Sequence, residues 1–458
     1  MVGEYLFTVD DCVNYYKNTP MELDLATTAR YLIDKYKIVT LLPEHSVLRY
    51  QDGIYIDNGI EIMRADLERN FGELKNNKHR NLLNKETKAE VIDKVESLTY
   101  TEHYKQLSPV KVPTFDSDLD IINMCNGLYN WRTGDFKRHT AEYKSRIQVA
   151  VNYDPEADCP RLMSIIRDVL DAKDVPKFLE FCAYCYYRSY IIQKGVIFFG
   201  EASTGKSQLL AMIANSIGKW NTTSVTFQDL GGRNIDRYAT AKLYNKLVNI
   251  AGDMDATSVP EVGKFKMLTS GEDSIPARMI YGRPFEFYNF AKMVLSGNEL
   301  PEVNDNSDGF YRRIEIFRTE KKFSASGGKY ERLKALTDPE ELSGLFNICI
   351  GMLPDLLERK EFTNPMKVED VKHLYSKGSN PLEEFLNQCV ADEDEEYISK
   401  EDFYNCYVDF CKNNKLAYIG SREGFGKELK KYWNNHPVQR KLYGGKRKEC
   451  WMHVRVTV

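Results

Sequence analysis

One eight-residue stretch, 200–207 with the sequence GEASTGKS, has the glycine, lysine and hydroxyl spacing that suits the phosphates of a nucleotide. An apolar run, 195–199, precedes it and a helical pattern, 208–215, follows, which predicts a strand, a loop and a helix. Glycines let successive backbone N–H groups face one anion, and the helix N-terminus adds partial positive charge. The alternative without a function is a glycine turn that binds no ligand.

Within this stretch, Lys206 is expected to reach the β- and γ-phosphates of ATP, and the Ser207 hydroxyl is expected to ligate Mg²⁺. The residues expected to contact the nucleotide are Gly200, Glu201, Ala202, Ser203, Thr204, Gly205, Lys206, Ser207 and Gln208.

Two aspartates, Asp253 and Asp255, follow a second apolar run, 247–251. A carboxylate at the end of such a strand can hold Mg²⁺ and orient the attacking water. Asp253 is the expected metal ligand, and Asp255 is expected to act as the general base or to support that ligand. Both could instead cap a turn or a helix, where aspartate is common.

Three more polar residues could complete a catalytic site. Asn298 ends the run KMVLSGN, from where its amide could touch the γ-phosphate or the lytic water. Arg312 and Arg313 precede the strand-like IEIF, and an arginine that reaches a neighbouring subunit's γ-phosphate stabilises charge during phosphoryl transfer. The alternative is a surface arginine pair at the start of a strand.

Two segments have the composition of nucleic-acid contacts. The stretch 275–287 alternates and turns at YGRP, which predicts a hairpin that presents Arg278, Tyr281 and Arg283 to a single strand, unless it packs inside one subunit. Residues 421–458 hold ten Lys/Arg against three Asp/Glu. A basic glycine turn there, with Lys446, Arg447 and Lys448, suits DNA phosphates, although a solvated tail or a protein-docking module has the same composition.

The 458 residues predict about three domains. The expected division is a mixed α+β domain over 1–190, an α/β domain over 191–375 and a winged-helix-like module over 376–458. The α/β domain is expected to contain a five-stranded, mostly parallel sheet with strands at 196–199, 224–227, 247–251, 293–296 and 314–317. Other expected elements are helices at 26–37, 85–98, 329–375, 382–390, 400–413 and 422–433, a hairpin or meander within 46–62, and strands within 121–136.

The composition limits which partners, cellular location and metal sites are expected for this chain. The net charge of −4 gives no global attraction for nucleic acid, so any such contact must be local. No apolar run is long enough to span a membrane and no secretion signal is apparent, which predicts a cytoplasmic protein of the host cell interior. Cys182 and Cys185 are expected to be core thiols rather than metal ligands, and the acidic run 392–396 is expected to be a solvated loop rather than a metal site.

These stretches resemble the superfamily 3 replicative helicases of viruses, phages and plasmids, specifically the helicase half of phage/plasmid-type primase–helicases. The likeness covers roughly 45–375 and is carried by GEASTGKS, by NKLVNIAGDMDA, by GKFKMLTSGEDSIPARMIYGRPFEFYNFAKMVLSGNELPE and by DNSDGFYRRIEIF. The last is similar to the family's Asp-Ala-Phe-Trp-Arg-Arg, from which Gly309 and Tyr311 depart. Upstream, residues 122–161 look like the family's helicase-associated N-terminal domain.

The resemblance implies a hexameric AAA+ ring that moves 3′ to 5′ on single-stranded DNA and unwinds forked DNA. It makes 205–207 the Walker A core, Asp253 and Asp255 Walker B, and Asn298 sensor 1. It makes Arg312 or Arg313 a finger acting across the subunit boundary, and the hairpin around Arg283 the DNA reader of the central channel.

The leading hypothesis is therefore an ATP-driven DNA helicase for replication of a virus, phage or plasmid. A separate primase or polymerase is a possible partner, because too little chain precedes the Asp-x-Asp pattern at 116–120 for a primase fold of its own. The alternatives are an origin-binding initiator or loader that uses ATP only to assemble, and a motor on protein or duplex DNA such as a packaging ATPase.

Overall fold

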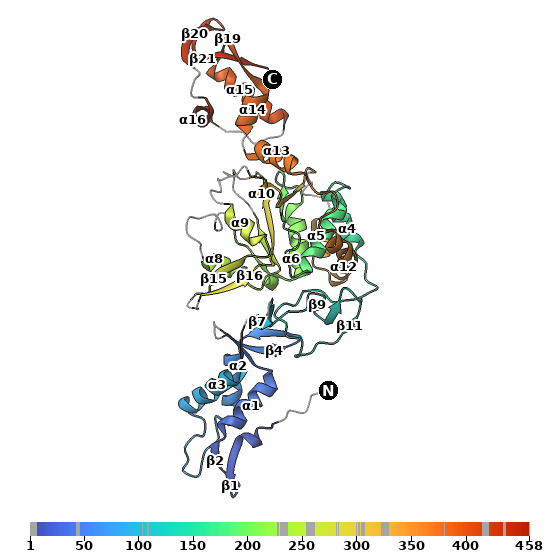
Figure 1. Ribbon diagram of the computed structural model, residues 1–458, viewed down its shortest axis with the longest axis vertical. Helices are drawn as coiled ribbons and strands as arrows, with labels where there is room; N and C mark the ends of the chain where they lie inside the picture. The colour runs from blue at the N-terminus through green and yellow to red at the C-terminus, as the bar shows by residue number, and fades with distance from the viewer. Residues whose placement is uncertain are drawn as a thin grey trace.

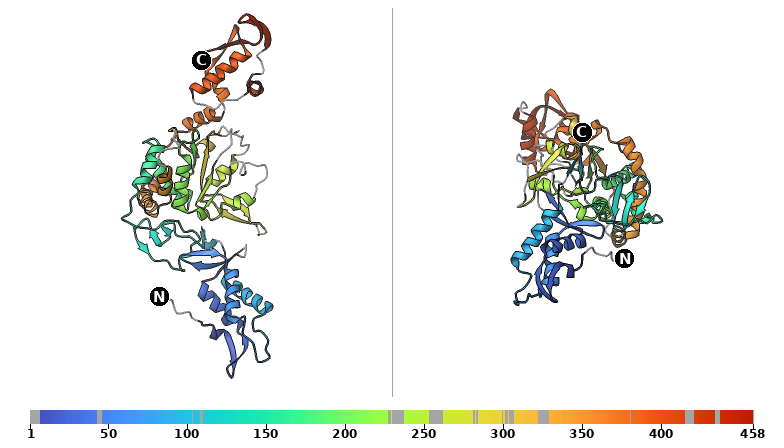
Figure 2. Two further views of the ribbon diagram at one scale, coloured as in Figure 1. Left: turned by 180° about the vertical axis from the view of Figure 1, so that it is seen from behind. Right: turned by 60° about the horizontal axis from the view of Figure 1, so that its bottom comes forward.

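The computed structural model describes residues 7–42, 46–102, 104–107, 110–226, 229, 237–252, 262–280, 282, 284–298, 300, 303, 307–321, 329–379, 381–414, 421–433 and 437–457. The chain forms an elongated molecule with the N-terminal region at one end, a central α/β body and a C-terminal module at the other end (Figure 1). The view from behind shows the same order along the long axis (Figure 2).

The N-terminal region packs α1 against α3 beside a small sheet of order β5-β4-β3-β6. The predicted helices 26–37 and 85–98 are confirmed, and the hairpin predicted within 46–62 is confirmed as β4 and β5, although the end of that segment, from Gly59, belongs to α2. Asp24 begins α1 by accepting hydrogen bonds from the N–H groups of Ala26 and Thr27 at 2.9 and 3.1 Å. The elements are η1 Asp10–Cys12, β1 Val13–Tyr16, β2 Thr19–Leu23, α1 Leu25–Tyr36, β3 Val39–Leu42, β4 Ser46–Gln51, β5 Ile54–Asp57, α2 Gly59–Phe71, α3 Lys85–Thr99, β6 Tyr100–Glu102, β7 Tyr104–Leu107 and β8 Val110–Pro113.

The central body is built on a five-stranded sheet of order β13-β14-β17-β12-β18, in which all neighbours are parallel. This confirms the predicted α/β class and the number of strands. The elements are β9 Ile121–Met124, β10 Gly127–Asn130, β11 Phe136–Lys137, α4 Pro160–Val169, α5 Val175–Tyr186, β12 Gly195–Phe199, α6 Lys206–Ile217, η2 Lys219–Asn221, β13 Thr222–Thr223, α8 Arg237–Ala241, β14 Val248–Ala251, α9 Gly263–Leu268, β15 Ser274–Arg278, β16 Pro284–Tyr288, β17 Lys292–Gly297, α10 Asp308–Tyr311, β18 Ile314–Arg318, α11 Lys329–Ala335, α12 Pro339–Arg359 and α13 Val368–Ser379.

The strand predicted at 224–227 is wrong in its bounds, because β13 covers only Thr222–Thr223. Beyond it, Val225 pairs with a side chain rather than with the backbone of β14. The buried Asn249 amide accepts from Val225 N–H at 2.7 Å and donates to the Val225 carbonyl at 2.9 Å. A carboxamide thus replaces one ladder position and satisfies two backbone groups that would otherwise be buried without partners.

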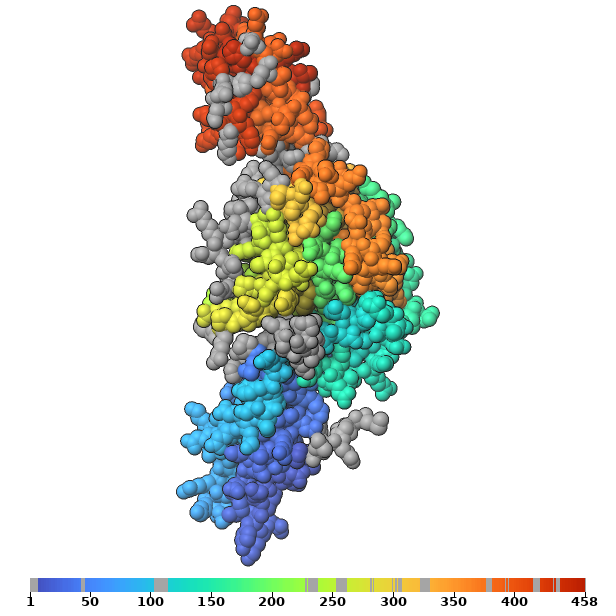
Figure 3. All heavy atoms as spheres, viewed as in Figure 1, coloured from blue at the N-terminus to red at the C-terminus, as the bar shows by residue number. Residues whose placement is uncertain are grey.

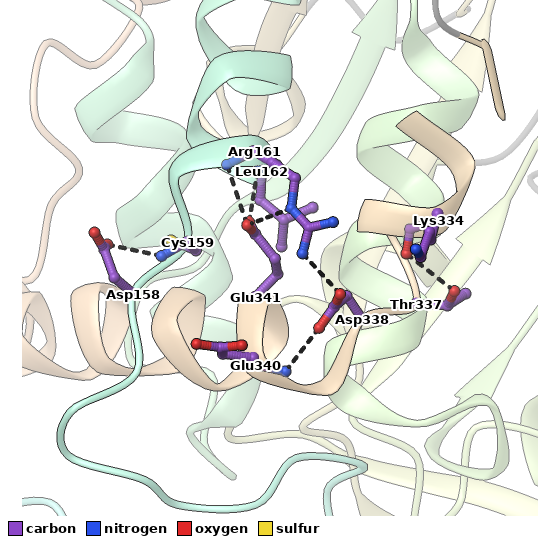
Figure 4. A network of polar contacts seen from close by, with 9 residues as sticks. All are labelled: Asp158, Cys159, Arg161, Leu162, Lys334, Thr337, Asp338, Glu340 and Glu341. Atoms are coloured by element: carbon purple, nitrogen blue, oxygen red, sulfur yellow. Dashed lines mark hydrogen bonds and ion pairs between the residues drawn. The ribbon is translucent and has the colours of Figure 1, made fainter. Parts of the chain in front are cut away.

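Hydrogen bonds and ion pairs link α4, which precedes the sheet in sequence, to the start of α12, which follows it. At the start of α4, Arg161 donates to Asp338 at 2.7 Å and to Glu341 at 2.8 Å (Figure 4). Glu341 also accepts from the backbone N–H of Leu162 at 2.9 Å, which suits a carboxylate at a helix N-terminus. Cys182 and Cys185 are buried in α5, as predicted, within a hydrophobic cluster that also contains residues of β12, α6 and α12. Packing therefore continues across the expected boundary at 190, and the three-domain division stays a prediction.

The C-terminal module projects from the body beyond α13 (Figure 3). Its elements are α14 Pro381–Cys389, β19 Val390–Ser399, α15 Lys400–Asn413, α16 Arg422–Tyr432, β20 Val438–Tyr443 and β21 Lys446–Val456, with an antiparallel sheet of order β19-β21-β20. The glycine turn predicted between the last two strands is confirmed, with φ of 54° and 78° at Gly444 and Gly445. The acidic run 392–396 is not a loop: it lies in β19, where the register with β21 shifts between Asp392 and Tyr397.

None of the helices described here is both long enough and apolar enough to cross a membrane. Over the same described residues, no group of three or more His, Cys, Asp or Glu side chains is arranged to hold a metal ion.

Candidate functional site

The glycine-rich loop leaves the carboxyl end of β12 and enters α6. Gly200 has φ of 154°, and a Cβ on it would lie 2.2 Å from the Thr319 carbonyl oxygen, so only glycine fits there. Gly205 has φ of 92° and caps the N-terminus of α6. Both glycines are therefore required by backbone geometry, and they hold the loop between a parallel strand and a helix N-terminus, where backbone N–H groups favour an anion.

Lys206 is held over this loop and against the neighbouring strand. Its Nζ donates to the carbonyls of Gly200 and Glu201 at 2.5 and 2.6 Å, and to Asn298 Oδ1 at 3.0 Å. Asn298 directly follows β17, which pairs with β12 in parallel. The two residues are 92 positions apart in sequence, and the meeting of their side chains follows from the carboxyl ends of adjacent parallel strands lying at one edge of the sheet.

Thr319 is a residue of this site that the sequence did not mark. Its hydroxyl lies 2.7 Å from the hydroxyl of Thr204, which also donates to the Glu201 carbonyl at 2.8 Å. Thr319 follows β18, the strand on the other side of β12. The loop is therefore supported from both neighbouring strands, by Asn298 on one side and Thr319 on the other. A threonine one residue past a strand end carries no pattern that would have identified it.

The remaining loop residues are open to a ligand. Glu201, Ala202, Ser203 and Ser207 are exposed, whereas Thr204 is buried. Ser207 lies in the first turn of α6, so its hydroxyl is accessible to a phosphate-bound cation. Gln208 is partly buried, and its Oε1 atom has no hydrogen-bond partner among the described residues. The predicted carboxylates Asp253 and Asp255 lie outside the described residues.

Arg312 and Arg313 lie at the opposite end of the sheet from the loop, because they precede β18 whereas the loop follows β12. Gln193 Oε1 accepts from Arg312 at 3.2 Å and from Arg313 at 3.4 Å, and Arg313 also donates to the Gly309 carbonyl at 2.6 Å. Burial, together with the charge of Arg312, lowers the pKa of Arg313. At about 3.3 Å per strand residue, a five-residue strand places these arginines roughly 16 Å from their own loop. Gln193 had no signal in the sequence.

The predicted β-hairpin is confirmed as β15 and β16, which pair from Ser274 with Tyr288 to Arg278 with Pro284. One face packs inward through Ile275, Ala277, Phe285 and Phe287, with the rings of both phenylalanines against Tyr244. At the tip, Arg278 is exposed and its Nε donates to the Gly282 carbonyl at 3.1 Å. The hairpin thus both packs in the core and presents its tip to solvent. Tyr281 and Arg283 lie outside the described residues.

The three basic residues at the last turn of the C-terminal module differ in exposure and in ion pairing. Lys446 and Arg447 are exposed, whereas Lys448 forms an ion pair with Glu401 at 3.1 Å. Lys400 likewise pairs with Glu449 at 2.9 Å. The geometry therefore separates the three predicted DNA-contacting residues into two exposed cations and one whose charge is offset by a carboxylate.

Three family matches cover separate parts of the chain. Residues 27–171 match the family described as D5 N terminal like, and residues 377–456 match one described as Poxvirus D5 protein-like. Residues 198–313, which contain the glycine-rich loop and the hairpin, match a family of unknown function, DUF5906.

A curated protein of Acanthamoeba polyphaga mimivirus named "Putative helicase" is 23% identical over 355 residues, which is 69% of this chain. The chain spans only 36% of that protein's length. Two apo structures of the NrS-1 C-terminal region are 13% and 11% identical, each covering 94% of this chain and 100% of its own, with TM-scores of 0.44 and 0.46. The chain is thus similar in two separate segments to D5-type families, and over a longer stretch to a mimiviral protein that carries the name of a helicase.

Proposed function

We propose that this protein is an ATP-dependent DNA helicase that serves viral DNA replication, of the superfamily 3 AAA+ type. The observation that carries the proposal is the 3.0 Å contact between Lys206 Nζ and Asn298 Oδ1, beside a glycine-rich loop at the carboxyl edge of a parallel sheet. Open parallel sheets bind ligands outside the carboxyl ends of their strands, where neighbouring strands connect in opposite directions. Here β12 has β17 on one side and β18 on the other.

ATP and Mg²⁺ fit the groups at this edge. The N-terminus of α6 would receive the phosphates, and Lys206 would exchange its contacts with the loop carbonyls for β- and γ-phosphate oxygens. Ser207 would hold Mg²⁺, which when bound offsets the charge that develops on the phosphates. Asn298 would orient the attacking water, and Asp253 and Asp255 would supply the metal ligand and the base.

The arrangement of the arginines favours action between subunits. Arg312 and Arg313 directly precede β18, at the edge of the sheet opposite their own loop, so a phosphate that either one contacts would belong to another copy of the chain. An arginine supplied in this way makes hydrolysis depend on assembly. We therefore include a ring, with six subunits and 3′ to 5′ movement, in the proposal.

DNA would contact the hairpin tip and the C-terminal module. Arg278 is exposed at the tip of β15–β16, and Lys446 and Arg447 are exposed at the last turn. The order helix, strand, helix, helix, strand, strand in 381–456 favours a winged-helix arrangement, in which a basic wing contacts phosphates.

The test is strand displacement on forked DNA with ATP and Mg²⁺, with the wild type and Lys206→Ala compared at equal concentration. We expect the variant to lose at least about 100-fold in hydrolysis and displacement, because removal of one preorganised charge-stabilising group typically has this effect. Lys219→Ala is the matched control, since Lys219 is exposed just beyond the other end of α6. Forks with only a 3′ or only a 5′ tail test the direction.

Mass measurement with ATP and a single-stranded oligonucleotide tests the ring. Displacement by Lys206→Ala at the wild-type rate would contradict the helicase proposal. DNA binding and ATP-dependent assembly without displacement would instead support the initiator alternative.

A further inference from the structure

A partly open pocket of about 260 Å³ lies away from the glycine-rich loop, where the N-terminal region meets the base of the β15–β16 hairpin. Its wall comes from parts of the chain that are far apart in sequence: the stretch before β9, the residues around Arg146, the segment 188–190 after α5, the turn before β14 and the segment that joins β16 to β17, together with Leu41 and Gly271. The lining residues 244–245 and 289–290 lie at the amino edge of the sheet, because β14 and β17 begin just after them. The pocket is therefore separate from the proposed ATP site.

Two donor atoms in this wall lack partners. Arg146 Nη1 and Asn245 Nδ2 are buried, and neither has a hydrogen-bond partner among the described residues. A buried polar group without a partner is costly, so such groups normally meet a ligand or water. Both atoms are hydrogen-bond donors, so a ligand in this pocket would have to present hydrogen-bond acceptors to them. Asn245 has φ of 55°, a conformation that asparagine tolerates better than most residues and that fixes its side chain on a tight turn.

The charges around the pocket favour an anion. Arg146 and Arg188 both line it, against a single carboxylate among the lining residues, Asp116. Arg188 donates to the backbone carbonyls of Asp116, Asp118 and Ile121, so Arg146 is the cation that a ligand would meet. The Asp116 carboxylate is already engaged by the Ser145 hydroxyl and by the backbone N–H of Arg146 at 2.8 Å. Burial, with a further contribution from the charge of Arg146, lowers the pKa of the nearby Lys246.

Aromatic rings make up much of the rest of the wall. Phe115, Tyr190, Tyr244, Tyr288 and Phe290 all line the pocket. The Arg146 guanidinium lies 5.8 Å from the centre of the Tyr244 ring, which places the cation beside an aromatic face. Aromatic rings beside cationic donors bind nucleobases by stacking and phosphates by charge-assisted hydrogen bonds.

We propose that this pocket binds one nucleotide, with its phosphate at Arg146 and Asn245 and its base among the aromatic rings. The nucleotide is either a free mononucleotide or one unit of a DNA strand, since the two share this chemistry. Such a ligand would join the N-terminal region to the base of the hairpin. The site differs from the loop at 200–207 in position and in residues, and it does not require that loop to bind ATP.

The test is calorimetric titration of the full chain carrying Lys206→Ala, so that binding at the glycine-rich loop is weakened in every sample. The probes are dAMP, deoxyadenosine, inorganic phosphate and a five-nucleotide oligo(dA). In this background we compare Asn245→Asp, which keeps the shape and the backbone tolerance but replaces a donor with a negative charge, with Asn245→Gly and Arg146→Gln. Arg138→Gln is the matched control, because Arg138 is exposed and outside the pocket.

We expect dAMP or the oligonucleotide to bind more tightly than deoxyadenosine or phosphate alone. Asn245→Asp and Arg146→Gln should each weaken that binding about tenfold or more, and Asn245→Gly by a smaller factor, whereas Arg138→Gln stays within about twofold. Binding of dAMP identifies a free nucleotide, and binding of the oligonucleotide alone identifies a strand; both support the site. Absence of binding by both probes, or equal binding by Asn245→Asp, Arg146→Gln and Arg138→Gln in samples with unchanged circular dichroism, overturns it.

Discussion

The two edges of the five-stranded sheet are built from opposite kinds of interaction. At the carboxyl edge, Lys206 and Ser207 are accessible and the polar contacts of Lys206 are with loop carbonyls and Asn298. At the amino edge, charged groups are buried: Glu315 in β18 is fully buried and accepts from Lys177 and Lys194, each at 2.8 Å. Lys292, the first residue of β17, is also fully buried.

This difference indicates that the contacts at the amino edge stabilise the fold, whereas those at the carboxyl edge can be replaced by a ligand. A buried carboxylate with two lysines tolerates no exchange of partners, because any lost partner leaves an uncompensated charge. Carbonyl and amide contacts to Lys206 can be exchanged for phosphate oxygens at little cost, because the group stays near water. We therefore expect substitutions at the amino edge to change stability, and substitutions at the carboxyl edge to change catalysis.

The largest expected effect is at the amino edge, with Glu315→Gln. The change removes the carboxylate that accepts from both Lys177 and Lys194: Lys194 loses this partner, and Lys177 keeps the Asp174 carboxylate at 3.1 Å, so the free energy of unfolding should fall by about 3–5 kcal/mol. Urea unfolding followed by circular dichroism measures this. Glu320→Gln is the matched control, because the Glu320 side chain is 61% exposed and pairs with the exposed Arg318. Such surface pairs contribute about 0–1 kcal/mol.

Hydrolysis by Glu315→Gln, corrected for the folded fraction, should stay near the wild-type value. If Glu315→Gln kept its stability but lost hydrolysis, this result would contradict the expectation that the amino edge determines stability and the carboxyl edge determines catalysis.

The next effect is at the carboxyl edge, with Asn298→Ala. Loss of the amide should lower the rate of ATP hydrolysis about 100-fold, which corresponds to about 2.7 kcal/mol of transition-state stabilisation. Steady-state kinetics and urea unfolding of the same preparation test it, with Glu315→Gln as the reciprocal control. Full hydrolysis with reduced stability would assign Asn298 to the scaffold instead of the chemistry.

The carboxyl edge was more predictable from sequence than the amino edge, for a physical reason. Strand-end residues of parallel strands meet at one edge, so the loop at 200–207 and Asn298 could be placed together from the order of apolar runs. Thr319 and Gln193 were missed because a lone polar residue beside a strand has no spacing to recognise. Arg312 and Arg313 were predicted from the sequence and stay a prediction as site residues, and only the structure shows that Gln193 accepts hydrogen bonds from both.

Two segments were predicted wrongly because a side chain, or a strand distant in sequence, determines their backbone conformation. The run 224–227 is β-branched and aromatic, yet Val225 pairs with the Asn249 carboxamide and the strand ends at Thr223. Residues 392–396 are acidic enough to be interpreted as a solvated loop, but they lie in β19, which pairs with the long β21. Neither partner can be identified from the local composition.

The smallest expected effect is a pH dependence of stability from Lys292. Its ammonium donates to the carbonyls of Tyr187, Ser189 and Phe290 at 2.7 to 2.9 Å, and lies 4.2 Å from the centre of the Tyr184 ring. Burial, with a contribution from Arg188, nevertheless lowers the pKa of Lys292 to about 7. The unfolded chain, with a lysine pKa near 10.4, therefore binds more protons than the folded chain above pH 7.

Because the folded state is the one that loses the proton first, the unfolding free energy should rise with pH between 7 and 9, by up to about 1.4 kcal/mol per pH unit. Below pH 7 this contribution should level off, since both states are then protonated. The measurement is the difference in urea midpoint between wild type and Lys292→Met at each pH, with exposed Lys219→Met as the control. A difference that does not change with pH would mean that the carbonyls and the Tyr184 ring hold Lys292 charged throughout. The amino edge would then be fixed entirely by ionised groups.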